Sequence, residues 1–191
     1  YGFARAFSGK NCFGADAIRW LDKNLFGRGL EAGAVSLYFL PLGEPTCPTP
    51  DNVRFVFLEK ESLPPFYLPQ WSNALCEERK SLDVFAVAAL CGGLTAGLAG
   101  ASCDCSDMLQ IGVDVLPAFR GRGLGAALTS RLAACIRAAG KTAFYCCEAG
   151  NLPSIKTALR SGFRPTATRL SAQKQKLSLI HISEPTRLRC I

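Results

Sequence analysis

An apolar segment that leads directly into a glycine-rich loop and then into an amphipathic helix constrains this chain most. The segment is Met108–Val115, the loop contains Arg120-Gly121-Arg122-Gly123-Leu124-Gly125, and apolar residues then recur with helical spacing up to Ala139. We expect a strand, a tight turn and a helix in that order. The first turn of such a helix carries free backbone N–H groups and the positive end of the helix dipole, and the glycines allow close approach. The sequence therefore predicts a phosphate-binding site here.

Apolar periodicity and turn residues predict the other elements. Strands are expected at Ala34–Leu40, Asn52–Leu58, Asp83–Ala89, Leu94–Ala101, Thr142–Cys147 and Pro165–Leu170. Helices are expected at Ala15–Asn24, at Leu152–Arg160 and in the second half of the proline-interrupted segment Glu61–Arg79. A Gly92-Gly93 turn makes a hairpin of two strands, and Met108–Val115 follows as a third antiparallel strand. The segment Thr142–Cys147 can lie parallel to Met108–Val115 across the intervening helix. The order predicts an α/β fold, with a mixed, mostly antiparallel central sheet flanked by helices.

We expect three parts along the chain. Residues 1–50 are interpreted as the remnant of an N-terminal subdomain with a proline-rich linker, because the chain begins at Tyr1 without a methionine. Residues 51–170 form the main domain. Residues 171–191 form a tail that resembles a translated sequencing adapter from about Leu177. The alternative is a native polar tail. The tail holds His181, the chain's one histidine, so we assume no histidine at a site.

Composition narrows the functional classes. Hydrophobic residues make up 49% and charged residues 19% of the chain, which favours a globular fold over disorder. The formal net charge of +7 suits an anionic ligand, and the scattering of the basic residues argues against nucleic acid as the main partner. The ten cysteines form no Cys-x-x-Cys pair. We therefore expect no metal site, reduced thiols and a cytoplasmic location. No apolar stretch reaches transmembrane length, so no membrane partner is expected.

Two motifs in this element order resemble the GNAT superfamily of acetyl-coenzyme A-dependent N-acetyltransferases. The family's signature, Gln or Arg, two residues, Gly, one residue, Gly or Ala, reads here from Arg120 to Gly125. The second motif is an Asn that opens a short helix ending in Gly-Phe, here Asn151 to Gly162-Phe163. The resemblance spans residues 52–170. It implies that the parallel strands Met108–Val115 and Thr142–Cys147 splay apart and hold the cofactor between them.

The resemblance also implies which residues bind acetyl-coenzyme A. They are Val113, Val115, Arg120, Gly121, Arg122, Gly123, Leu124, Gly125, Asn151 and Ser154. A pyrophosphate and a long polar arm also suit the predicted helix terminus. For Asn151 and Ser154, simple capping of the short helix is an equally open alternative.

The implied reaction is direct attack of a neutral amine on the thioester, with a small-molecule or peptide amine as acceptor. The family's usual acid is a tyrosine seven residues after the motif's Asn, and Ala158 stands there. Tyr145 is the candidate for a substitute acid. The alternative is that Tyr145 is a buried core residue without a role in proton transfer. Asp114 and Glu148 are the candidate bases. Asp114, however, points away from the face shared by its neighbours, and Glu148 can be a solvated loop residue.

Other readings of the same features stay open. Cys146 and Cys147 suggest an acyl-cysteine route, for which buried packing is the alternative. The missing tyrosine keeps a non-catalytic acyl-coenzyme A-binding or sensing module open. A basic nucleic-acid-binding domain is the third hypothesis, and homodimerisation is left open.

Overall fold

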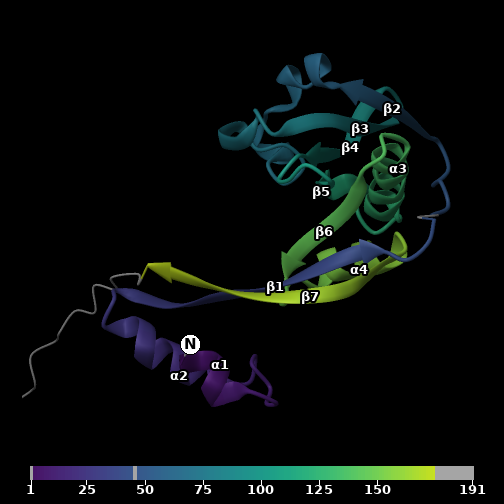
Figure 1. The fold of residues 1–191 in the computed structure, drawn as a ribbon. Coiled ribbons are helices and arrows are strands. Elements are labelled where there is room, and N and C mark those ends of the chain that lie inside the picture. Colours follow the sequence, from purple (N-terminus) through teal and green to yellow (C-terminus); the bar gives the residue numbers. More distant parts are fainter. Residues whose placement is uncertain (1, 45–46, 175–191) are drawn as a thin grey trace, which may run out of the picture. The chain divides into compact units, whose positions relative to one another are not determined.

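Seven strands form one mixed sheet in the order β2-β3-β4-β5-β6-β1-β7 (Figure 1). The strands are β1 (Leu30–Pro41), β2 (Val53–Glu59), β3 (Asp83–Cys91), β4 (Leu94–Ser102), β5 (Met108–Val115), β6 (Thr142–Glu148) and β7 (Phe163–Lys174). The structure is a computed structural model that describes residues 2–44 and 47–174. β5 and β6 pair in parallel, whereas β2, β3, β4 and β5 pair successively antiparallel and β1 pairs antiparallel with β6. The predicted fold class is confirmed.

The described residues divide into two units, one within Val35–Arg169 and the other made of residues 2–34 with 170–174. The latter unit holds the helices α1 (Gly2–Phe7) and α2 (Ala15–Phe26) and the remaining ends of β1 and β7. This division differs from the boundary that we predict near residue 50. The reason is that residues 36–39 of β1 pair with β6 and so belong to the sheet. The predicted adapter-like segment from Leu177, with His181, lies outside the described residues.

Several predicted elements have the expected limits. β5 covers Met108–Val115 and helix α4 covers Leu152–Arg160, as the patterns indicate. The turn between β3 and β4 has positive φ angles of 55° at Gly92 and 84° at Gly93, which glycine adopts readily. Helix α3 spans Leu124–Ala138 and is followed by Gly140 at a φ of 72°.

The helix expected in the second half of Glu61–Arg79 is absent, and this prediction is wrong. The segment after β2 forms short 3-10 turns instead, η1 (Lys60–Ser62), η2 (Pro64–Phe66), η3 (Pro69–Trp71) and η4 (Glu77–Arg79). Its apolar side chains are held on the sheet, where Leu63, Trp71 and Leu75 are at most 3% exposed. Non-local packing thus decides the conformation of this segment.

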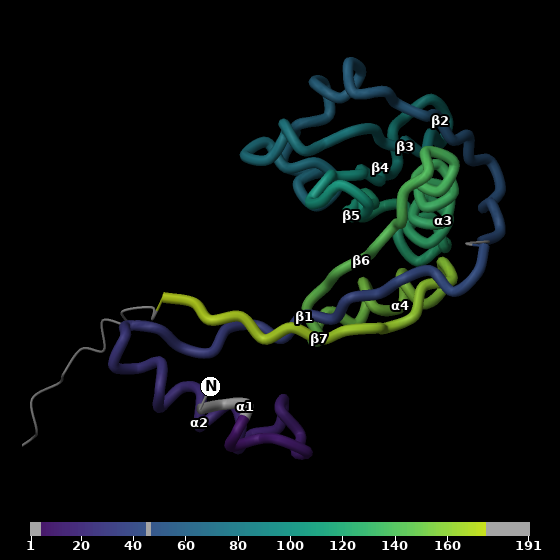
Figure 2. Tube along the Cα trace, in the orientation of Figure 1, coloured from purple at the N-terminus to yellow at the C-terminus, as the bar shows by residue number. Residues whose placement is uncertain are grey.

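The two faces of the sheet have different covers. α3 packs on one face through Leu128, Leu132 and Ile136, which are fully buried. The turn segment after β2 covers the opposite face, against side chains of β3 and β4. Figure 2 follows the chain from β5 through α3 to β6. No helix within the described residues is long and apolar enough to cross a membrane.

Two glycines let the turn segment lie directly on the sheet. Gly100 of β4 and Gly112 of β5 are cross-strand partners. A Cβ atom at Gly112 would overlap the carbonyl oxygen of Asn73, and one at Gly100 would overlap that of Ala74. A strand glycine often marks such a close backbone approach. The position of the Asn73 and Ala74 backbone against the sheet therefore requires glycine at residues 100 and 112.

Candidate active site

The parallel strands β5 and β6 pair along only part of their length. Their register runs from Met108 opposite Thr142 to Ile111 opposite Tyr145, and no further pair is formed. Beyond this point, Gly112–Val115 and Cys146–Glu148 line a cavity of about 820 Å³. The strands therefore open around a cavity at the place where the resemblance predicts a splay.

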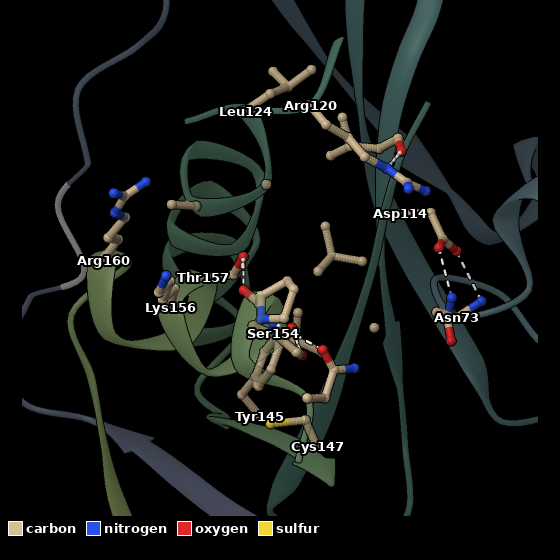
Figure 3. Close-up of a pocket in the computed structure, with 18 of the residues that line it drawn as sticks. Asn73, Asp114, Arg120, Leu124, Tyr145, Cys147, Ser154, Lys156, Thr157 and Arg160 are labelled. Atoms are coloured by element: carbon tan, nitrogen blue, oxygen red, sulfur yellow. Dashed lines mark hydrogen bonds between the residues drawn. The ribbon is translucent and has the colours of Figure 1, made fainter. Parts of the chain in front are cut away.

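The backbone of β5 presents polar groups to this cavity. The N–H of Leu116 donates to the carbonyl of Ala96 at 2.9 Å, and Val115 lies opposite Gly97. Because hydrogen-bonded and non-bonded pairs alternate along an antiparallel ladder, the backbone groups of Val113 and Val115 point away from β4. Arg120 Nε donates to the Val115 carbonyl at 2.9 Å (Figure 3). The N–H and C=O of Val113 thus face the cavity.

The N-terminus of α3 opens into the same cavity. Gly123 is the N-cap residue, with a φ of 80°, and no side chain caps the helix. The first helical bond runs from the Ala127 N–H to the Gly123 carbonyl at 3.1 Å, so the preceding three N–H groups have no partner within the helix. The first turn contains no acidic residue, and Gly123, Leu124 and Gly125 line the cavity. This arrangement suits an anion.

Cationic side chains surround this terminus. Arg120 lines the cavity from the loop, and Lys156 and Arg160 line it from α4 (Figure 3). Arg122 is exposed and is not among the lining residues. Lys156 and Arg160 were missed from the sequence. Their i, i+4 spacing, which places both on one helix face, is the signal that points to them.

Tyr145 combines a core position with a hydroxyl at the cavity. The residue is 4% exposed, and its ring makes edge contacts with Phe39 and Phe163. Its hydroxyl lies 2.7 Å from Ser154 Oγ, and both residues line the cavity. Burial raises the pKa of Tyr145 above its usual value, against an opposing effect of the Ser154 hydrogen bond. The phenol therefore stays protonated at neutral pH, as a proton donor must be.

Asn151 and Ser154 form the helix cap that is one of the two roles the sequence allows them. Asn151 Oδ1 accepts a hydrogen bond from the Ser154 N–H at 3.1 Å and so caps α4. Both residues also line the cavity, so capping and ligand contact are compatible. Ala158, at the family's tyrosine position, is fully buried.

Asp114 is tied to the cavity wall. Its carboxylate accepts hydrogen bonds from the Asn73 N–H at 2.8 Å, from Asn73 Nδ2 at 2.7 Å and from the Ala74 N–H at 2.9 Å. Figure 3 shows Asp114 pointing to Asn73. As expected, it leaves the strand on the face opposite Val113 and Val115, which pack with the α3 side of the core. The geometry favours an anchoring role for Asp114 over proton transfer.

The remaining candidates lie at the end of β6. Glu148 is exposed and lines the cavity, as do Cys146 and Cys147. Burial raises the pKa of the Cys147 thiol, which disfavours the nucleophilic thiolate. The nine cysteines among the described residues are free thiols, and no group of three metal-binding side chains occurs among these residues. The geometry favours packing for Cys147.

Comparison with known proteins finds a partial family match and a similar fold. Residues 96–171 match the family model described as FR47-like protein. The fold is similar to a GCN5-related N-acetyltransferase-like protein of Streptococcus suis, with a TM-score of 0.57, 18% identity, and coverage of 83% of this chain and 68% of that one. Residues 96–171 therefore resemble the FR47-like family, and the fold is similar to that of GCN5-related N-acetyltransferases.

Two further GNAT structures are similar in fold. A GCN5-related N-acetyltransferase of Kribbella flavida has a TM-score of 0.60 at 19% identity, covering 80% of this chain and 61% of that one. One of Sphaerobacter thermophilus has a TM-score of 0.58 at 14% identity, covering 80% and 55%. The chain thus spans between 55% and 68% of the length of these structures. No curated protein matches the sequence.

The fold brings the predicted site residues together. All of them except Arg122 line the one cavity between β5, β6, α3 and α4. The cavity also has lining residues that the sequence did not indicate, which include Asn73, Gln110, Lys156, Thr157 and Arg160.

Proposed function

We propose that this chain transfers an acetyl group from acetyl-coenzyme A to an amine. The GNAT fold supports acyl transfer in general. The observation that carries the proposal is the uncapped N-terminus of α3, which opens into the cavity between β5 and β6.

The residues around the cavity fit acetyl-coenzyme A. The first N–H groups of α3 and the glycine loop suit a pyrophosphate, and Lys156 and Arg160 add positive charge. The Val113 backbone, which faces the cavity, suits the polar arm. When bound, acetyl-coenzyme A supplies an acyl group activated as a thioester. The Val113 N–H is a donor for the acyl oxygen as negative charge develops on it.

Proton transfer is assigned to two side chains in this proposal. Glu148, at the cavity mouth, accepts a proton from the acceptor amine through water. Tyr145, which stays protonated, donates a proton toward the departing sulfur, either directly or through the Ser154 hydroxyl. Holding both reactants in one cavity contributes to the rate as well.

Thiol release from acetyl-coenzyme A with a panel of amines tests this function. Amine-dependent release supports acetyl transfer. Tight binding of acetyl-coenzyme A in calorimetry without release with any amine supports the second candidate, a non-catalytic acyl-coenzyme A-binding module. That candidate is favoured by the buried Ala158 at the tyrosine position. Absence of both binding and release contradicts both candidates.

The proposal includes the location of the protein and the partner of its positive charge. The free cysteines support a reducing, cytoplasmic location. The basic groups that line the cavity favour an anionic cofactor over nucleic acid as the partner of the positive charge.

A further inference from the structure

One part of the sheet face opposite α3 and α4 carries an aromatic pair. Tyr38 on β1 lies opposite Cys146 on β6. Side chains alternate between the two faces along a strand. Since Phe39 and Tyr145 belong to the core on the helix side, Tyr38, Phe144 and Cys146 point to the opposite face. Tyr38 and Phe144 are half-buried and belong to neither apolar cluster of the described residues.

The two rings form a shelf beside a cation. The centroids of Tyr38 and Phe144 are 6.2 Å apart and the rings are 19° from parallel. We call this pair the aromatic shelf. The guanidinium carbon of Arg169, on β7, lies 5.4 Å from the Tyr38 centroid. None of the ion pairs within the described residues includes Arg169, so its charge is available to a ligand.

The aromatic shelf is continuous with the cavity. Cys146 lines the cavity, and Tyr38 is its cross-strand partner on the same face of the sheet. Glu148 lies two residues further along β6, on the same face, and also lines the cavity. It too takes part in none of the ion pairs of the described residues. The face therefore presents a carboxylate at the cavity mouth, the two rings, and the cation of Arg169.

These groups complement one class of acceptor. We infer that the acceptor is a primary aliphatic amine that also carries an aromatic ring and a carboxylate, such as an aromatic amino acid. Its amino group lies at the cavity mouth near Glu148, its ring stacks on the aromatic shelf, and its carboxylate pairs with Arg169. This inference rests on the proposed acetyl transfer, because it assigns the acceptor of that reaction.

Three probe amines separate the contribution of the acceptor's aromatic ring from that of its carboxylate. Phenylalanine carries the ring and the carboxylate, phenethylamine lacks the carboxylate, and alanine lacks the ring. We expect kcat/KM for phenylalanine, measured by thiol release, to exceed that of each other probe by roughly tenfold or more. Arg169→Gln should lower the ratio of phenylalanine to phenethylamine by roughly tenfold. Phe144→Leu should lower the ratio of phenylalanine to alanine.

Arg164→Gln is the matched control. Arg164 is an exposed arginine on the same strand, and its guanidinium donates to the carbonyls of Leu159 and Phe163, away from the aromatic shelf. The variant removes the same charge and should keep both ratios of the unmodified protein.

The outcomes distinguish this inference from the proposed function. Acetyl transfer with equal kcat/KM for phenylalanine and phenethylamine, unchanged in Arg169→Gln, overturns the inference and leaves acetyl transfer standing. If no amine supports thiol release, acetyl transfer fails, and calorimetric titration of phenylalanine into the coenzyme A-loaded protein tests the shelf directly. Binding that weakens in Arg169→Gln supports the assigned surface, and absence of binding overturns it.

Discussion

Replacing Asp114 separates an anchoring role from proton transfer at the candidate site. Its carboxylate accepts three hydrogen bonds from Asn73 and Ala74, which form one wall of the cavity. Asp114→Ala removes all three acceptor contacts. Asp114→Asn keeps an oxygen for the two backbone N–H groups, and the Asn73 side-chain amide can rotate to accept from the new amide.

The expected cost follows from burial. Ala74 is 3% exposed, so Asp114→Ala leaves its N–H without a partner. Asn73 is exposed, so its donors can turn to water. An unsatisfied buried donor plus two weakened exposed bonds amounts to about 3 kcal/mol of unfolding free energy. For Asp114→Asn we expect about 1 kcal/mol, from loss of the charge. Both variants should stay folded, since domains of this size unfold at roughly 5–15 kcal/mol.

Urea unfolding and thiol-release kinetics together test this reasoning. Asp114→Ala should raise the KM of the acceptor more than it lowers kcat, because the wall shifts while the groups that transfer protons remain. Asp114→Asn should keep kcat within about fivefold, since its anchoring contacts are retained. A fall in kcat of roughly a hundredfold in Asp114→Asn, at nearly unchanged stability, would identify Asp114 as the base and refute the anchoring role.

Three other substitutions test the site and the wall. Gly123→Asp should weaken acetyl-coenzyme A binding by at least about tenfold more than Gly123→Asn, which has the same shape without the charge; equal affinities in calorimetry would move the phosphate site away from the loop. Tyr145→Phe should lower turnover by roughly a hundredfold at unchanged cofactor affinity, because the ring remains, and wild-type turnover would leave solvent as the acid. Gly112→Ala should destabilise the protein by about 2 kcal/mol or more in urea unfolding, because its Cβ would overlap Asn73, whereas Gly125→Ala meets only ordinary contacts. Equal stability of these two variants would contradict the close approach.

The local sequence pattern was sufficient to predict an element where its hydrophobic periodicity and the residues at its ends agree. The limits of β5 and α4 follow from the apolar periodicity of Met108–Val115 and from the Asn151 cap with Arg160 at the helix end. The helix terminus at Gly123 was predictable because loop, cap and helix are contiguous in the chain. The turn segment after β2 was not, since long-range packing of Trp71 and Leu75 decides its conformation.

The sequence by itself determined the strand, the loop and the helix whose N-terminus is free, and with its second motif it indicated a resemblance to the GNAT superfamily. These features depend on backbone preferences over a few residues. The tertiary structure alone decided that β1 lies between β6 and β7. It also decided that Asp114 accepts a hydrogen bond from Ala74, 40 residues earlier in the chain, and that the Arg169 guanidinium lies over the Tyr38 ring. Such contacts join segments that are remote in the chain. They depend on how the sheet and its covers pack, which no local pattern specifies.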